Sequence, residues 1–323
     1  MRKINWGVLG TAGIARGQTI PGMVLAENCN LYAIAGRSMA KAEDYRREFG
    51  FEVAYDSYEA LLSDPKVEAV YIPLPNQLHR EWAMKALNAR KHVLCEKPLA
   101  PTAKEAAEMV ACAELNGVYL MEAFAYLHSP LTAAIKAELP RLGRVLYVDS
   151  SFMTSDYDVS NIRMRRETCG GALYDLGCYC LSQIQWLLDA EPETVQAVAQ
   201  FSDRKVDAVT TGLMTFPGGA RATFSCGMVL ATEQNQRVDR CLIRGERGYI
   251  LNACAFNQCG ELSYTICVDG VTETRTVSVR QNYALEVEQL GRCIAGDERP
   301  FVTNAFSLRN ARTIDRVLEE IGY

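Results

Sequence analysis

The chain has 323 residues, more than the roughly 250–300 residues at which a single hydrophobic core stops growing, so two domains are expected. Hydrophobic residues make up 49% and charged residues 23% of the chain, a balance that excludes disordered, collagen-like and coiled-coil proteins. The 34 Lys and Arg residues against 39 Asp and Glu residues give a formal net charge of −5, which argues against binding to nucleic acid or to an anionic membrane.

Cysteine and histidine usage bears on the cellular compartment and on metal binding. The 12 cysteines include no Cys-x-x-Cys pair, and the chain has only 3 histidines. A secreted disulfide scaffold would be shorter and denser in cysteine, so we expect reduced cysteines, a cytoplasmic protein and no metal site. Glycines break the apolar stretch after Arg2 and Lys3, and no run reaches about 18 apolar residues, so neither a signal peptide nor a membrane span is predicted.

The first 121 residues alternate between strand-like and helix-like segments. Strands are predicted at residues 4–9, 31–35, 53–55, 69–72, 92–95 and 119–121. Helices are predicted from the glycine-rich turn to about residue 27, with a kink at Pro21, and at residues 41–49, 57–62, 80–89 and 103–116. This alternation predicts right-handed crossovers between parallel strands, and therefore a doubly wound, dinucleotide-binding Rossmann domain over residues 1–121.

The pattern changes in residues 122–323, where runs rich in Thr and Val alternate. Strands are predicted at residues 143–155, 194–201, 208–216 and 220–228, and a hairpin at Asp269-Gly270. Helices are predicted at residues 173–188, 284–295 and 306–321. We expect an open, mainly antiparallel sheet with helices on one face, forming a substrate-binding and oligomerisation domain whose last helices pack back on the Rossmann domain.

The first motif that carries chemistry is the run Gly10-Thr11-Ala12-Gly13-Ile14-Ala15, which directly follows the first strand and opens a helix. This is the context that a dinucleotide fingerprint requires: Gly10 permits the tight turn, and backbone N–H groups at the helix start can face a pyrophosphate. Ala12 stands where the fingerprint has its second glycine. The alternative is an ordinary glycine-rich turn between a strand and a helix.

The end of the second predicted strand distinguishes the two nicotinamide dinucleotides. An NAD site places a carboxylate there to bind the ribose 2′-hydroxyl, whereas this chain has Gly36-Arg37-Ser38. An arginine and a hydroxyl suit a 2′-phosphate, so NADP is favoured over NAD. The alternative is that Arg37 is a solvated loop residue.

The third motif is Cys95-Glu96-Lys97-Pro98, at the carboxyl end of a predicted strand. Strand ends of this kind bind the ligand in an open α/β sheet. A lysine beside a cationic nicotinamide would have its pKa lowered by charge repulsion and desolvation, toward the range of an acid–base group. Out of this context, Glu-Lys-Pro is only a surface turn.

With these motifs the chain resembles the glucose-fructose oxidoreductase, inositol dehydrogenase and rhizopine-catabolism (Gfo/Idh/MocA) superfamily. The resemblance is carried by the Gly10 turn, by Asn76 to His79, by Glu96-Lys97-Pro98, by Met121 to Phe124 and by Gly170 to Tyr179. It covers essentially the whole chain. It implies a nicotinamide-dependent oxidoreductase that acts on a sugar or a related cyclic alcohol or aldehyde.

The resemblance also implies roles for single residues. Lys97 matches the catalytic lysine of the family, and the Lys97–Pro98 peptide bond is expected to be cis. Asp175 matches a carboxylate that borders the substrate. Many members have a histidine four residues further on, whereas Tyr179 resembles the subgroup of glucose-fructose oxidoreductase, D-xylose dehydrogenase and dimeric dihydrodiol dehydrogenase. Asn161-Ile162-Arg163 resembles the same subgroup, so the inositol dehydrogenase interpretation is disfavoured.

The spacing of Asp175 and Tyr179 agrees with a shared role, because residues i and i+4 lie on one face of a helix. A free tyrosine has a pKa near 10, and a cationic Lys97 nearby would favour the phenolate. The alternative for Tyr179 is a core aromatic residue whose hydroxyl is hydrogen-bonded.

The motifs and the resemblance together define a predicted site. The predicted catalytic residues are Lys97, Tyr179 and Asp175. The predicted cofactor contacts are Gly10, Thr11, Ala12, Gly13, Ile14, Ala15, Arg37, Ser38, Leu74, Asn76, His79, Glu96, Lys97 and Tyr126. The predicted substrate contacts are Lys97, Tyr126, Asn161, Arg163, Asp175, Tyr179 and Tyr283, with further contacts from residues 157–166. Two alternatives stay open: His79 could be structural, and Arg163 could pair with a nearby carboxylate.

We therefore predict reversible hydride transfer between NADP(H), or NAD(H), and a sugar-like substrate, with Tyr179 exchanging the proton, Lys97 tuning Tyr179 and Asp175 orienting the reacting groups. The alternatives are a non-catalytic sensor that binds the dinucleotide, and a glycosidase that uses tightly held NAD to oxidise the sugar transiently. Apolar residues on the open face of the C-terminal sheet would predict a homodimer or homotetramer.

Overall fold

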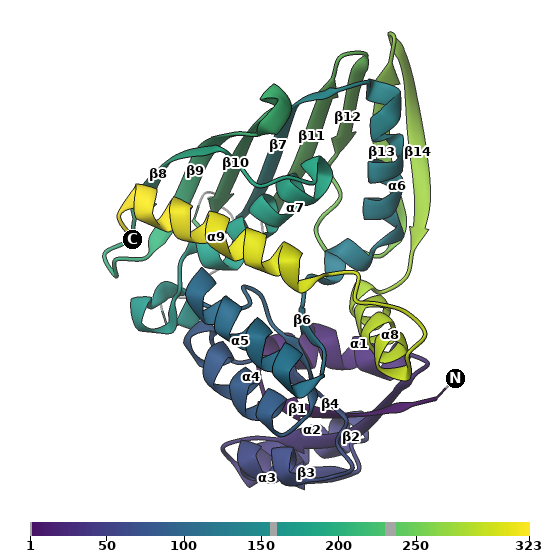
Figure 1. The fold of residues 1–323 in the computed structure, drawn as a ribbon, viewed down its shortest axis with the longest axis vertical. Helices are drawn as coiled ribbons and strands as arrows, with labels where there is room; N and C mark the ends of the chain where they lie inside the picture. Colours follow the sequence, from purple (N-terminus) through teal and green to yellow (C-terminus); the bar gives the residue numbers. More distant parts are fainter. Residues whose placement is uncertain (1, 156–159, 230–236) are drawn as a thin grey trace. The chain divides into compact units, whose positions relative to one another are not determined.

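The structure is a computed structural model, and it describes residues 2–155, 160–229 and 237–323. The chain forms two compact units whose segments alternate along the sequence (Figure 1). The first unit comprises Met1–Ala100, Lys104–His128 and Arg280–Ser307. The second comprises Pro101–Ala103, Ser129–Val279 and Leu308–Tyr323. The division into functional domains at residues 1–121 and 122–323 stays a prediction.

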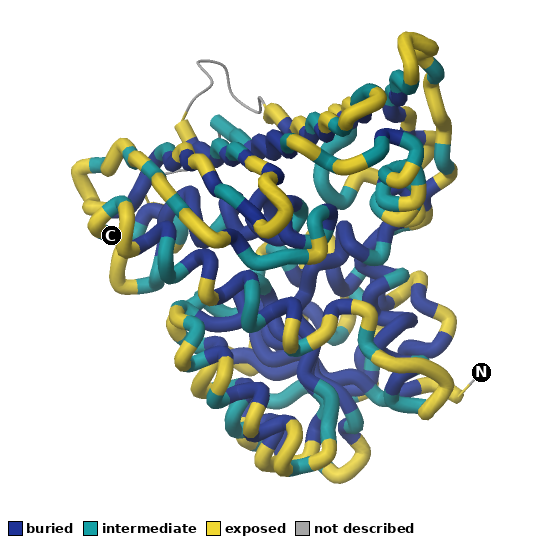
Figure 2. Tube along the Cα trace, turned by 45° about the horizontal axis from the view of Figure 1, so that its top comes forward, coloured by how far each residue is buried: buried dark blue, intermediate teal, exposed yellow. Residues whose placement is uncertain are grey.

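A six-stranded parallel sheet forms the centre of the first unit, in the order β3-β2-β1-β4-β5-β6. Its strands are β1 (Ile4–Leu9), β2 (Cys29–Ala35), β3 (Val53–Tyr55), β4 (Ala69–Ile72), β5 (His92–Cys95) and β6 (Leu120–Glu122). The central strands are buried almost throughout, as Figure 2 shows, because helices cover both faces of a parallel sheet. The strand order reverses between β1 and β4, and such a switch point is where open α/β sheets bind their ligands.

The helices of the first unit follow the predicted alternation. After β1, a π-helical turn (Ala15–Thr19) leads into α1 (Ile20–Leu25), with Pro21 in its first turn, where a proline is tolerated. The others are α2 (Met39–Phe49), α3 (Tyr58–Ser63), α4 (His79–Asn88), α5 (Ala103–Asn116) and α8 (Asn282–Ala295). Helix α8 comes from the C-terminal part of the chain and packs on α1, where a Cβ on Gly22 would lie 2.7 Å from the Cβ of Tyr283. The last helices therefore separate, with α8 in the first unit and residues 308–323 in the second.

The second unit contains an eight-stranded sheet in the order β14-β13-β12-β11-β7-β10-β9-β8. Its strands are β7 (Val145–Thr154), β8 (Thr194–Phe201), β9 (Asp207–Thr215), β10 (Arg221–Gly227), β11 (Arg237–Gly245), β12 (Gly248–Asn252), β13 (Gly260–Val268) and β14 (Val271–Val279). Neighbouring strands are antiparallel except for the parallel pair β7 and β10. The predicted hairpin turn forms at Asp269-Gly270, where both φ angles are positive (50° and 81°). The predicted fold class, a Rossmann domain followed by an open, mainly antiparallel sheet, is confirmed.

Helices cover one face of this sheet. The predicted helix at residues 173–188 consists of a π-helical turn (Leu173–Gly177) followed by α7 (Cys178–Leu188), which packs on β7, where the Ser150 hydroxyl donates to Gln183 Oε1 at 2.7 Å. Helix α9 (Asn304–Ile321) joins α7 through a 3.1 Å hydrogen bond from Gln185 to Asn310. Helix α6 (Pro130–Glu138) packs near β14 and was not predicted.

The opposite face of the sheet is mixed rather than apolar. Cross-strand neighbours on it include Leu213, Thr223, Asp149 and Leu242, which lie in one row across four strands. Thr223 donates to Asp149 at 2.9 Å, and Arg240 forms an ion pair with the same carboxylate. The expectation of an apolar face was therefore only partly right, because hydroxyl-bearing residues alternate with isolated exposed apolar side chains. The exposed apolar residues of this face are Val198, Leu213, Val238 and Leu251.

Candidate active site and cofactor site

The Gly10 turn at the end of β1 has the geometry that its sequence predicts. Gly10 has φ +126°, a conformation that residues with a Cβ rarely adopt, and its N–H donates to Ala35 O of β2 at 2.9 Å. A Cβ on Gly10 would lie 3.1 Å from Leu74 Cδ2, whereas a Cβ on Gly13 would meet nothing within 4 Å. The turn therefore depends on glycine at position 10 and not at position 13.

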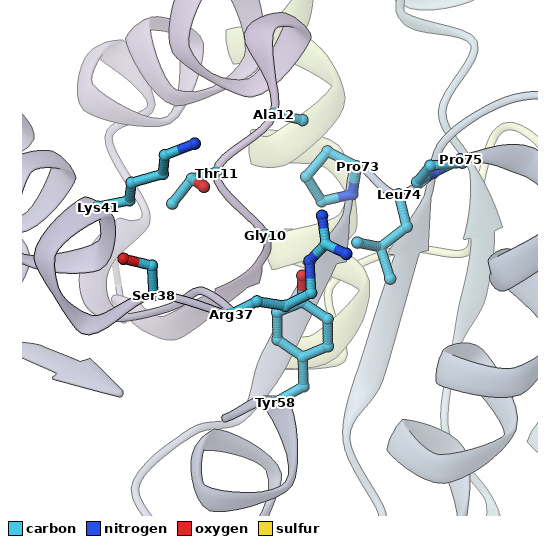
Figure 3. Close-up of a pocket in the computed structure, with 10 residues that line it drawn as sticks. All are labelled: Gly10, Thr11, Ala12, Arg37, Ser38, Lys41, Tyr58, Pro73, Leu74 and Pro75. Atoms are coloured by element: carbon cyan, nitrogen blue, oxygen red, sulfur yellow. The ribbon is translucent and has the colours of Figure 1, made fainter. Parts of the chain in front are cut away.

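A cavity of about 320 Å³ opens at this turn, and Figure 3 shows the side chains that line it. It brings together six of the predicted cofactor contacts: Gly10, Thr11, Ala12, Arg37, Ser38 and Leu74. Four lining residues were missed: Lys41, Tyr58, Pro73 and Pro75. The remaining predicted cofactor contacts, Gly13, Ile14, Ala15, Asn76, His79, Glu96, Lys97 and Tyr126, do not line this cavity.

The charge of the cavity wall is positive. Arg37 and Ser38 follow β2, and Lys41 lies in the first turn of α2, four residues after Arg37; none of the ten lining residues is acidic. Burial raises the pKa of the Tyr58 phenol, and the nearby Arg37 lowers it. The wall therefore offers two cations, a hydroxyl and the backbone of a helix start, which suits a ribose 2′-phosphate and a pyrophosphate. The four-residue spacing from Arg37 is the sequence signal that could have identified Lys41.

A second cavity of about 510 Å³ shares Thr11 and Lys41 with the first. Its remaining wall holds two exposed ion pairs, Arg16 with Glu48 at 2.6 Å and Arg47 with Asp44 at 2.7 Å. These pairs balance their own charges, so the net positive charge of this wall comes from Lys41, which both cavities share, whereas the first cavity has Arg37 as well.

The Glu96-Lys97-Pro98 segment follows β5, and the Lys97–Pro98 bond is cis, as expected. The buried Glu96 carboxylate accepts a 2.5 Å hydrogen bond from Tyr71, whose hydroxyl lies 2.9 Å from that of Thr19. Lys97 is half-buried, and its positive charge lies close enough to His79 and Glu122 to lower the pKa of both. The segment is thus fixed by buried polar contacts on either side of the lysine.

His79 holds two loops of the first unit together. Its ring is fully buried, with Nδ1 2.9 Å from Pro98 O and Nε2 2.8 Å from Leu74 O, and burial lowers the pKa of His79. Each ring nitrogen therefore lies within hydrogen-bond distance of a backbone carbonyl, and a neutral ring donates to one of the two. His79 connects the loop after β4 to the loop that carries Lys97, which agrees with the structural alternative.

Glu122, at the end of β6, is a buried acid that the prediction did not include. Its carboxyl accepts from the Leu99 N–H at 2.8 Å, and burial raises the pKa of Glu122 to about 7 in spite of hydrogen bonds from Ser307 and Leu99. Because Leu99 directly follows the cis proline, Glu122 fixes the segment after Lys97.

Two predicted contacts of the first unit are buried against its own elements. Tyr126 is 3% exposed and packs edge-on against Phe124 at 6.0 Å between ring centroids. Tyr283 lies on α8 against Gly22 of α1. Their roles toward cofactor or substrate stay predictions.

In the second unit, Asp175 lies in the π-helical turn and forms a 2.8 Å ion pair with Arg163 Nε. Asn161 caps the short turn before Arg163, because its Oδ1 accepts from the Arg163 N–H at 3.0 Å. Arg163 therefore pairs with a carboxylate, which was one of the two alternatives left open by the sequence. Asn161 fixes the backbone turn that carries Arg163. Residues 157–159 of the predicted contact segment lie outside the described residues.

The start of this helix rests on a buried acid. Asp207 Oδ2 accepts from the Leu173 N–H at 2.8 Å and from the Thr210 hydroxyl at 2.6 Å, and burial raises the pKa of Asp207 to about 6. A Cβ on Gly171 would lie 2.0 Å from Asp207 Oδ1, so glycine is needed where the helix approaches this carboxyl. Asp207 thereby positions the turn that carries Asp175.

Tyr179, in the first turn of α7, is 7% exposed and packs among aromatic rings. Its centroid lies 5.5 Å from that of Phe152 and 5.1 Å from that of Phe256, and Asn257 Nδ2 lies 3.5 Å from its hydroxyl. Phe256 and Asn257 come from the loop between β12 and β13 and carry no sequence signal, since neither belongs to a recognisable motif. Within the described residues, no group of three or more His, Cys, Asp or Glu side chains could hold a metal ion.

The fold and the cavity of the first unit define a class: a protein that binds a dinucleotide at the switch point of a Rossmann domain. The cavity residues fit such a group, because the tight turn, the helix start and the two cations match its phosphates. The second unit supplies a tyrosine and a paired carboxylate as candidates for proton transfer.

Comparison with known proteins gives the family. Residues 4–124 match an oxidoreductase family with an NAD-binding Rossmann fold, and residues 137–251 match the GFO/IDH/MocA C-terminal domain. The chain belongs to the Gfo/Idh/MocA family and is an NAD(P)-binding oxidoreductase. The resemblance found in the sequence is confirmed.

Individual relatives cover nearly the whole chain. A D-xylose 1-dehydrogenase (NADP(+)) from Haloferax volcanii is 36% identical over 97% of this chain and 96% of its own. A trans-1,2-dihydrobenzene-1,2-diol dehydrogenase from Mus musculus is 32% identical over 70% of this chain and 68% of its own. The crystal structure of a 3-ketoreductase from Actinomadura kijaniata with NADP and TDP-benzene has a TM-score of 0.92 at 30% identity, covering 99% of this chain and 98% of that one.

Proposed function

We propose that the protein transfers a hydride between NADP(H) and a sugar or a related cyclic alcohol or aldehyde. The observation that carries the NADP assignment is the cavity wall at the end of β2, where Arg37, Ser38 and Lys41 stand and no carboxylate is present to bind a ribose 2′-hydroxyl. The NADP-linked D-xylose dehydrogenase and the 3-ketoreductase crystallised with NADP support the same cofactor. The name of the D-xylose dehydrogenase also supports a sugar as the substrate class.

The cofactor assignment is tested by reversing the charge of the wall. In Arg37→Asp we expect the affinity for NADP to fall by roughly 10- to 100-fold, because a hydrogen-bonded charge pair with the 2′-phosphate is lost. The affinity for NAD should hold or rise. Arg90→Asp is the control, since it makes the same charge change at an exposed position of the first unit. Fluorescence titration with the reduced forms, NADPH and NADH, measures both, and an unchanged NADP preference in Arg37→Asp would overturn the assignment.

The proposed chemistry divides between the two units. When bound, the nicotinamide ring accepts or donates the hydride. In the oxidative direction Tyr179 Oη accepts the proton of the reacting substrate hydroxyl as the carbon–oxygen double bond forms, and it returns that proton in reduction. Lys97 would stabilise negative charge on the reacting oxygen and on the phenolate, and the Arg163–Asp175 pair would orient a neighbouring hydroxyl.

Lys97→Ala tests this mechanism. We expect kcat to fall by about 10²- to 10⁴-fold on the best substrate of a panel of aldoses and polyols. Lys104→Ala removes an exposed lysine of α5 and is expected to leave kcat unchanged. Turnover of Lys97→Ala within a few-fold of wild type would show that the mechanism is wrong.

We also propose that two copies of the chain associate through the mixed face of the eight-stranded sheet, as a homodimer or as half of a homotetramer. Cross-strand residues such as Leu213 and Gln196 lie side by side on this face, and exposed Val198 lies on the same face two residues further along β8. Light scattering at micromolar concentration tests it: wild type should be at least dimeric, and Val198→Asp combined with Leu213→Asp should shift the mass toward the monomer. A monomeric wild type would overturn the proposal.

The cytoplasmic location also stays a proposal, supported by the cysteines. Many of them are buried thiols, and burial raises the pKa of Cys29, Cys180 and Cys241 to about 12 each, which makes them unreactive. No helix within the described residues could span a membrane. Thiol titration of protein purified without reductant should find all 12 thiols free after unfolding.

A further inference from the structure

The loop of residues 253–259, between β12 and β13, encloses the ring of Tyr179. Phe256 of this loop has its ring centroid 5.1 Å from that of Tyr179 and 5.2 Å from that of Phe152, and Phe152 lies 5.5 Å from Tyr179. Three elements far apart in the sequence, β7, α7 and this loop, therefore hold one tyrosine ring in place. Packing of this kind fixes the position of the ring, while its hydroxyl can still gain or lose a proton.

Strand β11 anchors the loop on both sides of Phe256. The Phe256 N–H donates to Asp239 Oδ1 at 2.8 Å, and Arg237 donates to the Phe256 carbonyl at 3.1 Å. Arg237 and Asp239 are themselves joined by two hydrogen bonds, and the guanidinium lies 4.4 Å from the Phe152 ring. The loop is thus fastened to the same strands that support the aromatic cluster.

The next residue, Asn257, is held in a left-handed conformation with φ +62°. Asparagine tolerates this conformation better than most residues with a Cβ. The turn is closed by Gln258, whose N–H donates to Ala255 O at 3.1 Å and whose side chain accepts from the Ala255 N–H at 3.0 Å. The strained backbone aims the side-chain amide at α7, where Nδ2 lies 3.5 Å from Tyr179 Oη.

We propose that Asn257 is a positioning residue that donates a hydrogen bond to Tyr179 Oη and thereby favours the phenolate over the phenol. The inference rests on the proposed function, in which Tyr179 exchanges the proton with the substrate. At 3.5 Å the contact is long, and such contacts tighten when a complex forms.

The physical reason is the difference between a neutral and a charged acceptor. An N–H donor stabilises an anionic oxygen about twice as strongly as a neutral hydroxyl. The surrounding aromatic rings exclude water that would otherwise solvate the phenolate, so the Asn257 amide matters more there than it would at the surface.

Two variants keep the backbone conformation and change the donor. Asn257→Gly removes the amide and suits a positive φ, so the loop can keep its turn. Asn257→Asp keeps the shape and places an acceptor, which is negative at neutral pH, beside the phenol. Lys205→Gly is the matched control, because Lys205 is an exposed residue of the second unit with φ +60° and removing its side chain relieves the same kind of backbone strain away from Tyr179.

The first readout is the pH profile of substrate oxidation. In Asn257→Gly we expect the midpoint of the acid limb to move upward by about 0.5–1 pH unit, with kcat at pH 7 reduced about 3- to 10-fold and NADP affinity unchanged. In Asn257→Asp the upward movement should be larger, about 1–2 pH units, because a carboxylate repels the phenolate. A profile of Asn257→Gly that superimposes on those of wild type and Lys205→Gly would overturn the proposal.

The second readout needs no turnover. The protein has 15 tyrosines, so NMR of protein labelled at the tyrosine Cζ, with Tyr179→Phe to assign the signal, follows the ionisation of this phenol alone. We expect the midpoint of Tyr179 ionisation to rise in Asn257→Gly, and a midpoint that does not move would overturn the proposal. If the midpoint rises while Tyr179→Phe keeps full activity, the hydrogen bond stands and the proposed role of Tyr179 in catalysis fails, so the two failures are distinguishable.

Discussion

The cofactor site of the first unit and the tyrosine site of the second unit are built in opposite ways. In the first, a glycine at φ +126° forms the turn after β1, and most of the other lining residues directly follow the parallel strands β2 and β4, so the sheet itself brings them together. In the second, side chains from separate segments hold one another, as Arg163 holds Asp175 and the β12–β13 loop holds Tyr179. Each site also has a π-helical turn beside it, at Ala15–Thr19 and at Leu173–Gly177, as often occurs at functional sites.

This difference suggests how the two sites would respond to change. A dinucleotide presents the same pyrophosphate to every member of a family, so a backbone turn can bind that group, and side chains such as Arg37 are needed only for the 2′-phosphate. A substrate differs from one member to the next, and a site made of side chains on several loops can change without altering the fold. The first site should therefore be sensitive to backbone geometry and the second to single polar atoms.

The largest expected effect is that of Tyr179→Phe, which removes one oxygen from the second site. We expect kcat/KM to fall by about 10²- to 10⁴-fold, because proton exchange with the substrate is lost, while NADP affinity stays within about 2-fold of wild type. Steady-state kinetics and cofactor titration measure the two quantities.

Tyr174→Phe is the matched control for this variant. Tyr174 lies five residues earlier, and its hydroxyl donates to the Pro101 carbonyl at 2.8 Å, so its loss should cost stability and not turnover. Loss of NADP affinity in Tyr179→Phe, or equal losses of kcat/KM in the two variants, would contradict the assignment of cofactor binding to the first unit and proton exchange to Tyr179.

The second prediction concerns Asp207, which supports the start of the helix that carries Asp175. Its pKa is raised to about 6, so the folded state holds the proton more tightly than the unfolded chain. Wild type should therefore lose stability as pH rises from about 4 through about 6, by up to about 3 kcal/mol from this group. Asn at this position cannot titrate, so Asp207→Asn should gain stability relative to wild type over the same window.

Urea unfolding at several pH values between 4 and 8 measures this difference. Asp203→Asn, at an exposed position, should follow the wild-type curve throughout. If the free energies of unfolding of Asp207→Asn and wild type change in parallel with pH across the window, the pKa of the Asp207 carboxyl is not raised in the folded protein and the prediction is wrong.

The third prediction tests the backbone character of the first site. Gly10→Ala introduces a Cβ at φ +126° and 3.1 Å from Leu74 Cδ2, so we expect NADP affinity to fall about 10- to 100-fold, with a lower melting temperature. Gly13→Ala places its Cβ in open space on a helix and should leave affinity unchanged. Similar losses of affinity in both variants would show that Gly10 and Gly13 both lie against the cofactor, and that the effect is not specific to the turn at Gly10.

Much of the fold could be predicted from the sequence because its periodicity is local. Strands such as β1 and β4 are continuous apolar runs, and the predicted helix at residues 57–62 forms with Ser57 as its N-cap, since the Ser57 hydroxyl accepts from the Ala60 N–H at 3.1 Å. Strand β2 begins two residues earlier than predicted, because the polar Asn30 pairs with Asn5 of β1. Helix α6 and the pair β11–β12 were missed: α6 is short, and arginines such as Arg240 and Arg244 interrupt the apolar pattern of β11.

In the candidate sites, only the residues that belong to recognisable motifs could be predicted from the sequence. Gly10, Arg37 and Leu74 belong to recognisable segments and do line one cavity. Asn257 lies 78 residues from Tyr179, and their contact depends on the pairing of β7, β11 and β12, which no local pattern specifies. The sequence marks Glu122 only as part of the segment Met121 to Phe124 and does not mark Asp207, whereas the structure shows that burial raises the pKa of both carboxyls.

The smallest expected effect defines the edge of the cofactor site. Arg16 lines the second cavity and pairs with Glu48 at 2.6 Å, with both side chains at least one-third exposed. Solvent screens exposed pairs and they add little to stability, so Arg16→Gln should leave both the melting temperature and the NADP affinity unchanged. Lys41, which lines both cavities, should by contrast lose about 3- to 10-fold in NADP affinity when changed to Ala. If Arg16→Gln weakens NADP binding as much as Lys41→Ala does, the phosphates of the cofactor reach into the second cavity, and side chains contribute more to the first site than its backbone geometry indicates.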